Sequence, residues 1–483
     1  MPAFLGLPEG VIAEVVSPER LETTYVDTKD LRLARWGVSL RHRLGQGWTL
    51  KLPDQGGGDL RIRPEYEFKG DPTQVPAAAA DLITAFARGA KLDPVARLRT
   101  VRRRARILDA SGVLLVEVAD DEVSVLSAGR LAARFREVEA EMGPDTPMPI
   151  LEAVVQELRR AGAGPADAAS KYLRAVGPRA LEPPDVVRPD LPDAPTPRDV
   201  LRLAIASGVT RLIEADPVAR IGEDPEGVHQ MRVAARNLHS QLGTFAALAD
   251  PAWEKPLGKE LGWLARALGG CRDADVMLEH LRAAVGELPE RDREVVEAAG
   301  LLGDLEANRK DAHRRTLRIL RSDRYVALLD RLVDAAAAPV LNASADGSLS
   351  PLIDLVEEQR RALRSRIKAV GVDPSAKDLH RIRVEAKRCR YATEVFIPVF
   401  HKQARSFARA AIGLQTVLGD LNDAVVMEMW IRSWAQAPGR SPEEAFVAGQ
   451  LVARQRVRAT RAHARWPRAW KAITKAERPR TWR

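Results

Sequence analysis

Polar and apolar residues alternate with a period of two through much of residues 20–140. Successive side chains of a β-strand point to opposite faces, so this alternation predicts strands that each have one charged face. Glycine-containing turn signals, LGQGW and PDQGGGD, separate these strands, and helical patterns occur near 75–90 and 147–175. The charged positions that share one parity are Arg41 and Arg43, then Arg61, Arg63, Glu65, Glu67 and Lys69, and then Glu137, Glu139 and Glu141. The pattern predicts an antiparallel, β-rich domain with a few helices.

After residue 197 the apolar positions instead recur three and four residues apart, as in PLIDLVEEQRRALRSRIKAVG. This spacing predicts amphipathic helices over nearly the whole remaining chain. Seven prolines lie within 178–197, and proline at that density excludes regular helix. We therefore expect an α+β multidomain protein with a β domain over 1–177, a linker over 178–197 and an all-α bundle over 198–475.

The helical half contains an internal duplication. HQMRVAARNLHSQLGTF, which begins at His229, matches HRIRVEAKRCRYATEVF, which begins at His380, at an offset of 151. LGGCRDADVM and LGDLNDAVVM match further along at an offset of 150. Two matches in order at nearly one offset predict two pseudo-symmetric helical repeats, at about 198–335 and 350–475.

Each repeat carries a stripe of basic residues at positions i, i+3, i+7 and i+10. The two stripes are His229, Arg232, Arg236 and His239, and then His380, Arg383, Lys387 and Arg390, with Arg388 beside them. Like charges on one helix stripe destabilise the helix unless an anion neutralises them. Each stripe is about 15 Å long, so two facing stripes would form a basic groove for several phosphates. A solvated helix face and a His–Asp metal pair are the alternatives.

A third basic stripe lies near the C-terminus. It is formed by Arg454, Arg458, Arg461 and Arg465, and we also place the first three in the groove, although a solvated helix face explains such a stripe equally well. The chain has a net charge of +9, and residues 196–483 carry 48 basic and 37 acidic residues. A polyanion-binding function would therefore belong to the helical half.

The composition also excludes several classes of protein. Two cysteines rule out a disulfide framework and a cysteine-based zinc site. The chain shows no signal-peptide pattern and no run near 18 apolar residues, so we expect a cytoplasmic protein with no membrane partner. Nucleic acid is a disfavoured partner, because no known nucleic-acid-binding motif is present and the basic stripes lack aromatic residues for base stacking.

The doubled H-x-x-R-V-x-x-[RK] helix with its LGxxxDxxV segment resembles the CHAD domain, the conserved-histidine α-helical domain. The first half resembles the CYTH domain of the triphosphate tunnel enzymes in the segments TYVDTKDLRLARWGVSLRHR, GWTLKLP, RPEYEF, RRRARI, VEVADDEVSV, FREVEAEM and SKYLRA. The resemblance implies an eight-stranded antiparallel tunnel that binds a triphosphate and a divalent metal. It also implies a helical domain that binds inorganic polyphosphate through its basic groove.

Residue by residue, the resemblance implies two sets of ligands in the tunnel. The triphosphate set is Arg41, Arg43, Lys51, Arg61, Arg63, Arg102, Arg104 and Lys171. The metal set, for Mg²⁺ or Mn²⁺, is Glu65, Glu67, Glu137 and Glu139. The opening ExExK strand of CYTH enzymes would fall before Met1, so either the start is truncated or the tunnel lacks its first strand.

Each tunnel position also has a purely structural interpretation. Arg63 and Glu65 would form a cross-strand ion pair, the run 102–104 would protect an exposed strand edge, and Asp120 and Asp121 would be turn residues. We therefore expect a protein that binds inorganic polyphosphate in the helical half and a triphosphate in the β domain, in the cytoplasm and at polyphosphate granules. The alternative is a metal-dependent triphosphatase or polyphosphatase in the β tunnel.

Overall fold

The computed structural model describes residues 2–477 apart from 54–63, 128, 166–168 and 372–373. Arg61 and Arg63 therefore lie outside the described residues. The chain divides into two compact units, Met1–Asp185 and Val186–Arg483, and the division falls within the proline-rich segment. None of the described helices is both long and apolar enough to cross a bilayer.

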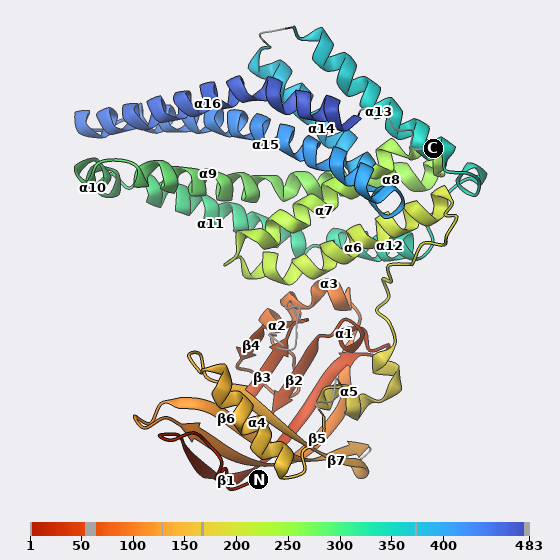
Figure 1. The fold of residues 1–483 in the computed structure, drawn as a ribbon, viewed down its shortest axis with the longest axis vertical. Coiled ribbons are helices and arrows are strands. Elements are labelled where there is room, and N and C mark those ends of the chain that lie inside the picture. Colours follow the sequence, from red (N-terminus) through yellow and green to blue (C-terminus); the bar gives the residue numbers. More distant parts are fainter. Residues whose placement is uncertain (1, 54–63, 128, 166–168, 372–373, 478–483) are drawn as a thin grey trace. The chain divides into compact units, whose positions relative to one another are not determined.

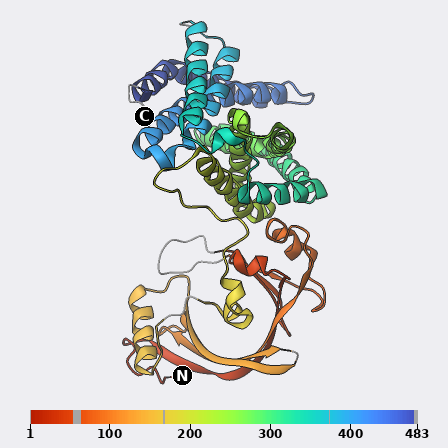
Figure 2. The ribbon, with the colours of Figure 1, turned by 90° about the vertical axis from the view of Figure 1, so that its right-hand side faces the viewer.

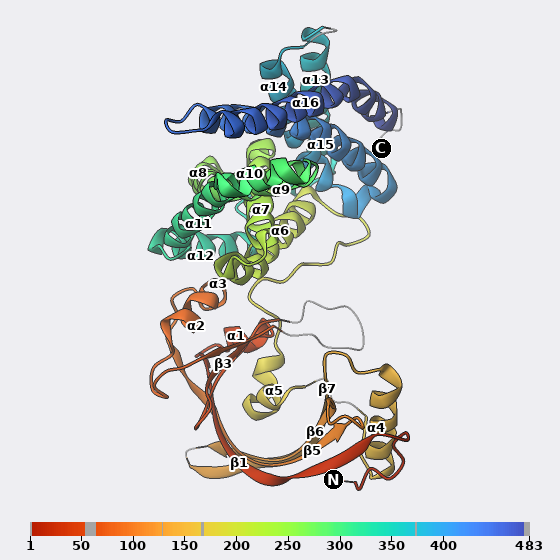
Figure 3. The same ribbon diagram turned by 90° about the vertical axis from the view of Figure 1, so that its left-hand side faces the viewer.

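The N-terminal unit is built on one antiparallel sheet with the strand order β4-β3-β2-β1-β5-β6-β7. Figures 2 and 3 show that the sheet is strongly curved, with a short helix, α5, on its concave side. The strands are β1 (Ile12–Thr28), β2 (Ser39–Arg43), β3 (Gly47–Lys51), β4 (Glu65–Phe68), β5 (Leu92–Leu108), β6 (Leu114–Ser127) and β7 (Arg130–Met142). Within the described residues the sheet has seven strands, where the resemblance implies eight, and β4 and β7 are its edges.

The strand register places the charged positions on one face of this sheet. Arg41 lies opposite Tyr25, and Tyr25 stacks on Tyr172 of α5 with ring centroids 4.6 Å apart. This face is therefore the concave one. Arg102 lies opposite Asp121, which lies opposite Glu137. The period-two pattern thus predicted correctly which side chains share a face.

Apolar side chains cover the part of the convex face that α4 packs against. Ile107 of β5 and Val118 of β6 are fully buried, and Val154 and Leu158 of α4 pack against them. Figure 3 shows α4 outside the curve of the sheet. The helices of the unit are α1 (Arg32–Arg35), α2 (Ala77–Leu82), α3 (Thr84–Ala87), α4 (Met148–Arg160) and α5 (Lys171–Val176), followed by the 3-10 helix η1 (Pro178–Leu181).

A buried carboxylate fixes the position of α5. Asp27 at the end of β1 accepts hydrogen bonds from the backbone of Leu33 and Ala34 and, at 2.6 Å, from the Tyr172 hydroxyl. The start of the proline-rich segment also packs on this unit, because the Trp36 indole donates to Asp185 and Arg88 forms an ion pair with it. These contacts hold α5, and with it Lys171, against the concave face.

In the C-terminal unit the described residues form helices and connecting loops, with one isolated β-bridge (Figure 1). Its helices are α6 (Pro197–Ile221), α7 (Pro225–Thr244), α8 (Pro251–Ala267), α9 (Gly269–Gly286), α10 (Glu290–Ala298), α11 (Leu301–Leu320), α12 (Asp323–Ala337), α13 (Ser350–Ala369), α14 (Ala376–Glu394), α15 (Ile397–Ala435) and α16 (Pro442–Glu477), with the 3-10 turns η2 (Ala246–Leu248) and η3 (Ala343–Ala345). The predicted order of a β-sheet domain followed by an all-α domain is confirmed.

The duplication is visible in these helices. A shift of 150 residues carries α6 onto α13, α7 onto α14 and α11 into α16. The same shift carries both α8 and α9 into the long helix α15, whose backbone is kinked at Phe400 and His401. The core joins both repeats, since Leu278 and Leu281 of α9 pack with Ile431 of α15 and Leu451 of α16.

Candidate functional site

The two basic stripes lie on α7 and α14, which pack against each other. Each helix begins at a capping side chain, because Asp224 accepts from the backbone amide of Glu226 and Ser375 accepts from that of Asp378. Each cap satisfies one free amide in the first turn of its helix and so favours the start of the helix at that residue. The pKa of Arg236 on α7 is lowered by burial, by its neighbour Arg232 and also by Arg383 on α14. The stripes of the two repeats therefore face each other.

One cavity of about 780 Å³ lies over these stripes, and we call it the basic groove. Seven of the predicted residues line it, namely His229, Arg232, Arg236, His380, Arg383, Lys387 and Arg390. The groove is thus built from equivalent positions of both repeats. Since α7 and α14 supply all seven, the helix packing itself brings the two stripes into one site.

Three cations of the two stripes have no carboxylate partner among the described residues: Arg236, Arg383 and Lys387. Arg232 pairs with Asp273 at 2.9 Å, and Arg390 lies 3.5 Å from Glu394. The Nε atoms of Arg232, Arg383 and Arg390 are buried and lack a hydrogen-bond partner in the described part of the chain. A buried donor without an acceptor costs free energy, so this arrangement is suited to an incoming anion.

Lys387 shows the electrostatic consequence most clearly. Burial and the guanidinium groups of Arg383, Arg236, Arg232 and Arg390 lower its pKa to about 7. Taking an ammonium out of water and placing it among like charges both favour the neutral amine. An anion in the groove would reverse the second effect and restore the charge on Lys387.

Part of the groove was not predicted from the sequence. Arg272 and His280 of α9 also line it, and partial burial followed by Arg458 lowers the pKa of His280. The acidic lining residues lie on α9 and α15, and they are Asp273, Glu279, Asp420 and Asp423. Mixed charges on α9 and α15 give no single-sign stripe, so the spacing rule that found α7 and α14 could not find these residues.

The paired LGxxxDxxV segments lie beside the two stripes. A Cβ at Gly269 would lie 3.7 Å from the Arg232 guanidinium, and one at Gly419 would lie 3.6 Å from that of Arg383. Each repeat thus places a glycine in contact range of its second stripe residue, in a pseudo-symmetric arrangement.

Five predicted groove residues do not line the cavity. His239 and Arg388 are exposed and lie outside the lining of the groove. Arg454 is bound to Glu287 at 2.7 Å. Arg458 lies beside the groove, 3.0 Å from His280 Nε2, and Arg461 is exposed on α16.

The N-terminal unit has its own charged site, the concave strip, whose residues lie on β2 to β7 and on α5. On β2 to β4, Lys51 binds Glu65 at 2.7 Å, and Arg41 lies 3.5 Å from the same carboxylate. The expected ion pair between Glu65 and Arg63 is not tested, because Arg63 lies outside the described residues. The Nε atoms of Arg41, Arg43 and Arg104 are buried, and no described residue accepts from them.

At the other side of the strip, Lys171 of α5 binds three carboxylates. Its Nζ lies 2.5 Å from Glu137, 3.0 Å from Glu139 and 3.0 Å from Asp121. Burial alone would lower the pKa of Lys171, but the three carboxylates outweigh it and raise that pKa. Lys171 therefore acts as the counterion of this carboxylate cluster.

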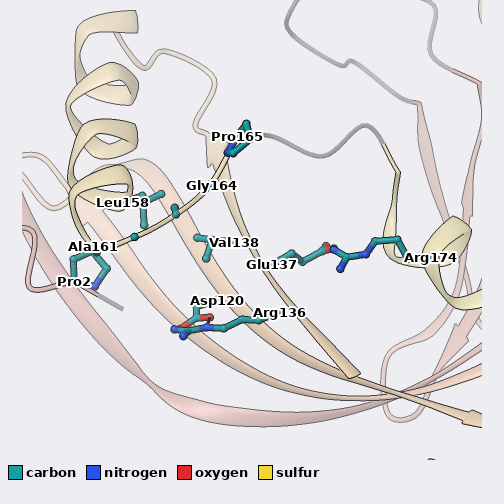
Figure 4. Close-up of a pocket in the computed structure, with 12 residues that line it drawn as sticks. Pro2, Asp120, Arg136, Glu137, Val138, Leu158, Ala161, Gly164, Pro165 and Arg174 are labelled. Carbon is teal, nitrogen blue, oxygen red and sulfur yellow. Dashed lines mark hydrogen bonds and ion pairs between the residues drawn. The ribbon is translucent and has the colours of Figure 1, made fainter. Parts of the chain in front are cut away.

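Asp120 and Asp121 lie inside β6 and not in the turn that the sequence predicts, because each has an arginine partner on a neighbouring strand. Arg102 donates two hydrogen bonds to Asp121, at 2.8 and 2.7 Å. Because β5 is an interior strand of the sheet, the run 102–104 does not protect a strand edge, contrary to the structural interpretation offered above. Arg136 donates two to Asp120, both at 2.7 Å. Figure 4 shows this second pair beside a cavity of about 480 Å³, with Glu137 reaching toward Arg174.

The four glutamates predicted to hold a metal do not form a ligand group. Glu65 and Glu67 belong to β4 and Glu137 and Glu139 to β7, at opposite edges of the sheet. Three of these carboxylates are already bound to lysines. In the part of the chain that the structure describes, no three His, Cys, Asp or Glu side chains are grouped as metal ligands. As the described side chains are arranged, Lys171 occupies the position among Asp121, Glu137 and Glu139 that a cation would take, and the four predicted glutamates form no site for a divalent ion.

A charged, curved antiparallel sheet followed by a duplicated helical unit with a basic groove defines a class of two-domain proteins. The CYTH domain family matches residues 4–172 and the CHAD domain family matches residues 203–432. The chain belongs to the proteins that carry a CYTH domain followed by a CHAD domain.

Two similar full-length proteins come from Mycobacterium tuberculosis strains, the uncharacterized proteins MT2285 and Rv2226. Each is 31% identical over 506 residues, which cover 99% of this chain and 94% of the relative. Among solved structures, PptA from Streptomyces chartreusis is 23% identical with a TM-score of 0.47, and the match covers 58% of this chain and all of that one. The CHAD domain from the plant Ricinus communis is 25% identical with a TM-score of 0.48, and the match covers 59% and 96% of the two chains.

Proposed function

We propose that the chain binds inorganic polyphosphate in the basic groove between α7 and α14. The observation that carries the proposal is the cluster of Arg236, Arg383 and Lys387, which comes from both repeats and has no carboxylate partner among the described residues. Guanidinium groups bind phosphate oxygens through paired donors, and a linear polyanion would neutralise the whole cluster at once. The location that goes with this proposal is the cytoplasm, at polyphosphate granules.

The concave strip is a second proposed site, for a triphosphate. The buried, unpartnered Nε atoms of Arg41, Arg43 and Arg104 support binding. Metal-dependent hydrolysis there would need a group of carboxylates that could hold a divalent ion, and the described residues form none. We therefore propose binding in this unit and derive no hydrolytic step.

The test is a titration of the full chain with long-chain polyphosphate, with and without Mg²⁺ or Mn²⁺, that follows both binding and phosphate release. We expect binding without release. Six arginine and lysine side chains line the groove, and a loss of about 0.7 log units of affinity per neutralised phosphate per log unit of salt, as for single-stranded nucleic acids, gives a slope near −4. Raising the salt from about 50 to 200 mM should then weaken binding roughly 10²-fold.

Each other outcome has a defined meaning. If no binding is seen at low salt, the proposal is wrong and the basic stripes are solvated helix faces. Metal-dependent phosphate release would make the chain an enzyme, contrary to the proposal. Equal competition by DNA at equal phosphate concentration would assign the groove to nucleic acid.

Binding should also depend on pH through Lys387. Its pKa of about 7 in the free protein rises when an anion binds, so binding takes up a proton above pH 7. Affinity should fall as the pH rises from 7 to 9, by up to about tenfold per unit. The groups that face Lys387 are Arg232 and Arg236 on α7 and Arg383 and Arg390 on α14, with Asp273 and Asp423 on the walls.

The matched variant for this prediction is Lys387→Arg, whose guanidinium stays charged throughout this range. We expect its affinity to be flat between pH 7.5 and 9. A wild-type affinity as flat as that of the variant would contradict the coupling. Isothermal titration in buffers of different ionisation enthalpy would count the protons taken up.

A further inference from the structure

Lys387 is the one lysine that lines the basic groove among the described residues. Its amine stands among four guanidinium groups, on a cavity wide enough to admit a small molecule. Neither a carboxylate nor a hydrogen-bond acceptor among the described residues engages it. A lysine placed beside cationic groups and away from water is an activated nucleophile. The groove therefore combines a phosphate-binding surface with a nucleophile.

We propose that Lys387 is a modification site, acylated by acyl phosphates that the surrounding arginines bind by their phosphate group. An acyl phosphate is a mixed anhydride of a carboxylic acid and phosphoric acid. Its negatively charged phosphate would be an anionic partner for Arg236 and Arg383, which have no carboxylate partner among the described residues. Binding this phosphate places the adjacent acyl carbon near the Lys387 amine, and holding two reactants together lowers the barrier to their reaction.

The reaction balances without a further reactant. The Lys387 Nζ lone pair attacks the acyl carbon, an N–C bond forms and the C–O bond to the phosphate breaks. Inorganic phosphate leaves, and the proton lost from nitrogen passes to phosphate or water. The product is a neutral amide, so one positive charge is removed from the centre of the groove. This inference rests on the proposed function, because acylation would then lower the affinity of the groove for polyphosphate.

Ionisation favours Lys387 over the other lysines. Because its pKa is about 7, roughly half of its amines are neutral at pH 7, whereas an ordinary lysine is neutral in fewer than one molecule in about 10³. Lys377 is exposed on the same helix and is the matched comparison. We expect Lys387 to react with acetyl phosphate about 10–100-fold faster than Lys377.

The experiment incubates the full chain with acetyl phosphate at pH 7.5 and measures acetylation of Lys387 and Lys377 by peptide mass spectrometry. A parallel reaction uses the N-hydroxysuccinimide ester of acetate, which has no phosphate. We expect the preference for Lys387 to be at least about tenfold greater with acetyl phosphate, and to fall toward the ester's value in Arg383→Ala. Equal preferences with the two reagents, or equal rates at the two lysines, would overturn the proposal.

Direct titration with polyphosphate separates this proposal from the function on which it rests. Polyphosphate binding together with slow acetylation of Lys387 rejects the modification site alone. Selective acetylation together with no polyphosphate binding rejects the proposed function alone. If both hold, acetylated protein should bind polyphosphate about tenfold more weakly than unmodified protein, and saturating polyphosphate should protect Lys387 from acetylation.

Discussion

Replacing Arg236 and Arg383 together by alanine should reduce polyphosphate affinity by roughly 10²–10⁴-fold. Each substitution removes one guanidinium group from the stripe of one repeat. Neither Arg236 nor Arg383 has a carboxylate partner among the described residues. A hydrogen bond to a charged group contributes about 1.5–3 kcal/mol, and each 1.4 kcal/mol is about tenfold in affinity. The salt slope should become shallower by about 0.7 unit for each arginine removed. Titration at several salt concentrations measures both quantities.

The matched control is Arg381→Ala. Arg381 is exposed on α14, the helix that carries Arg383, but its partner is Asp378 and it does not line the groove. We expect its affinity and salt slope to stay within about twofold of wild type. The double variant should also remain folded by circular dichroism, because it removes charges that repel each other in the free protein. Binding by the double variant at wild-type affinity would disprove the groove as the binding site.

The groove was predictable from the sequence to the extent that it follows helix periodicity. Positions i, i+3 and i+7 share a helix face, so the spacing of Arg232, Arg236, Arg383 and Lys387 is enough to predict the two stripes. Which helices pack together was a further step, and the duplication supported it. The C-terminal stripe shows the limit of periodicity, since Arg454 is neutralised by Glu287, a residue 167 positions away in the chain.

In the sheet, the alternation of polar and apolar residues predicted which side chains share a face but did not predict their tertiary partners. The two-residue period correctly placed the charged positions of β2 and β7 on the concave face. Asp120 and Asp121 were misassigned because aspartate favours turns when only local preferences are considered. Their strand conformation depends on Arg136 and Arg102 of neighbouring strands, and such cross-strand pairs are a tertiary property. The counterion role of Lys171 is likewise visible only when α5 packs on the sheet.

Replacing Lys171 by methionine should strongly destabilise the N-terminal unit. The substitution keeps most of the side-chain volume but leaves Asp121, Glu137 and Glu139 without their shared ammonium. Removing one partner of a buried ion pair costs about 3 kcal/mol or more when the remaining charge is left alone. Here Arg102 still pairs with Asp121 and Arg174 lies 3.7 Å from Glu137, so we expect a cost of about 1–3 kcal/mol. Hydrogen exchange in β6 and β7 of the full chain should then become roughly 10–100-fold faster at pH 7. The control is Lys91→Met, because Lys91 is 83% exposed and its pairing with Asp93 is solvated.

The pH dependence of this effect distinguishes electrostatics from a packing defect. The raised pKa of Lys171 means that its contribution to stability is complete below the ordinary lysine pKa and is lost only as the pH rises through the raised value. In the methionine variant the deficit comes from carboxylates that have lost their shared ammonium, and burial already raises the pKa of Glu137 in the wild-type protein. Protonation below about pH 5 should therefore restore much of the lost stability. A deficit that stays constant from pH 7 to pH 4.5 would assign Lys171 a packing role, because the volume of a side chain does not change with pH.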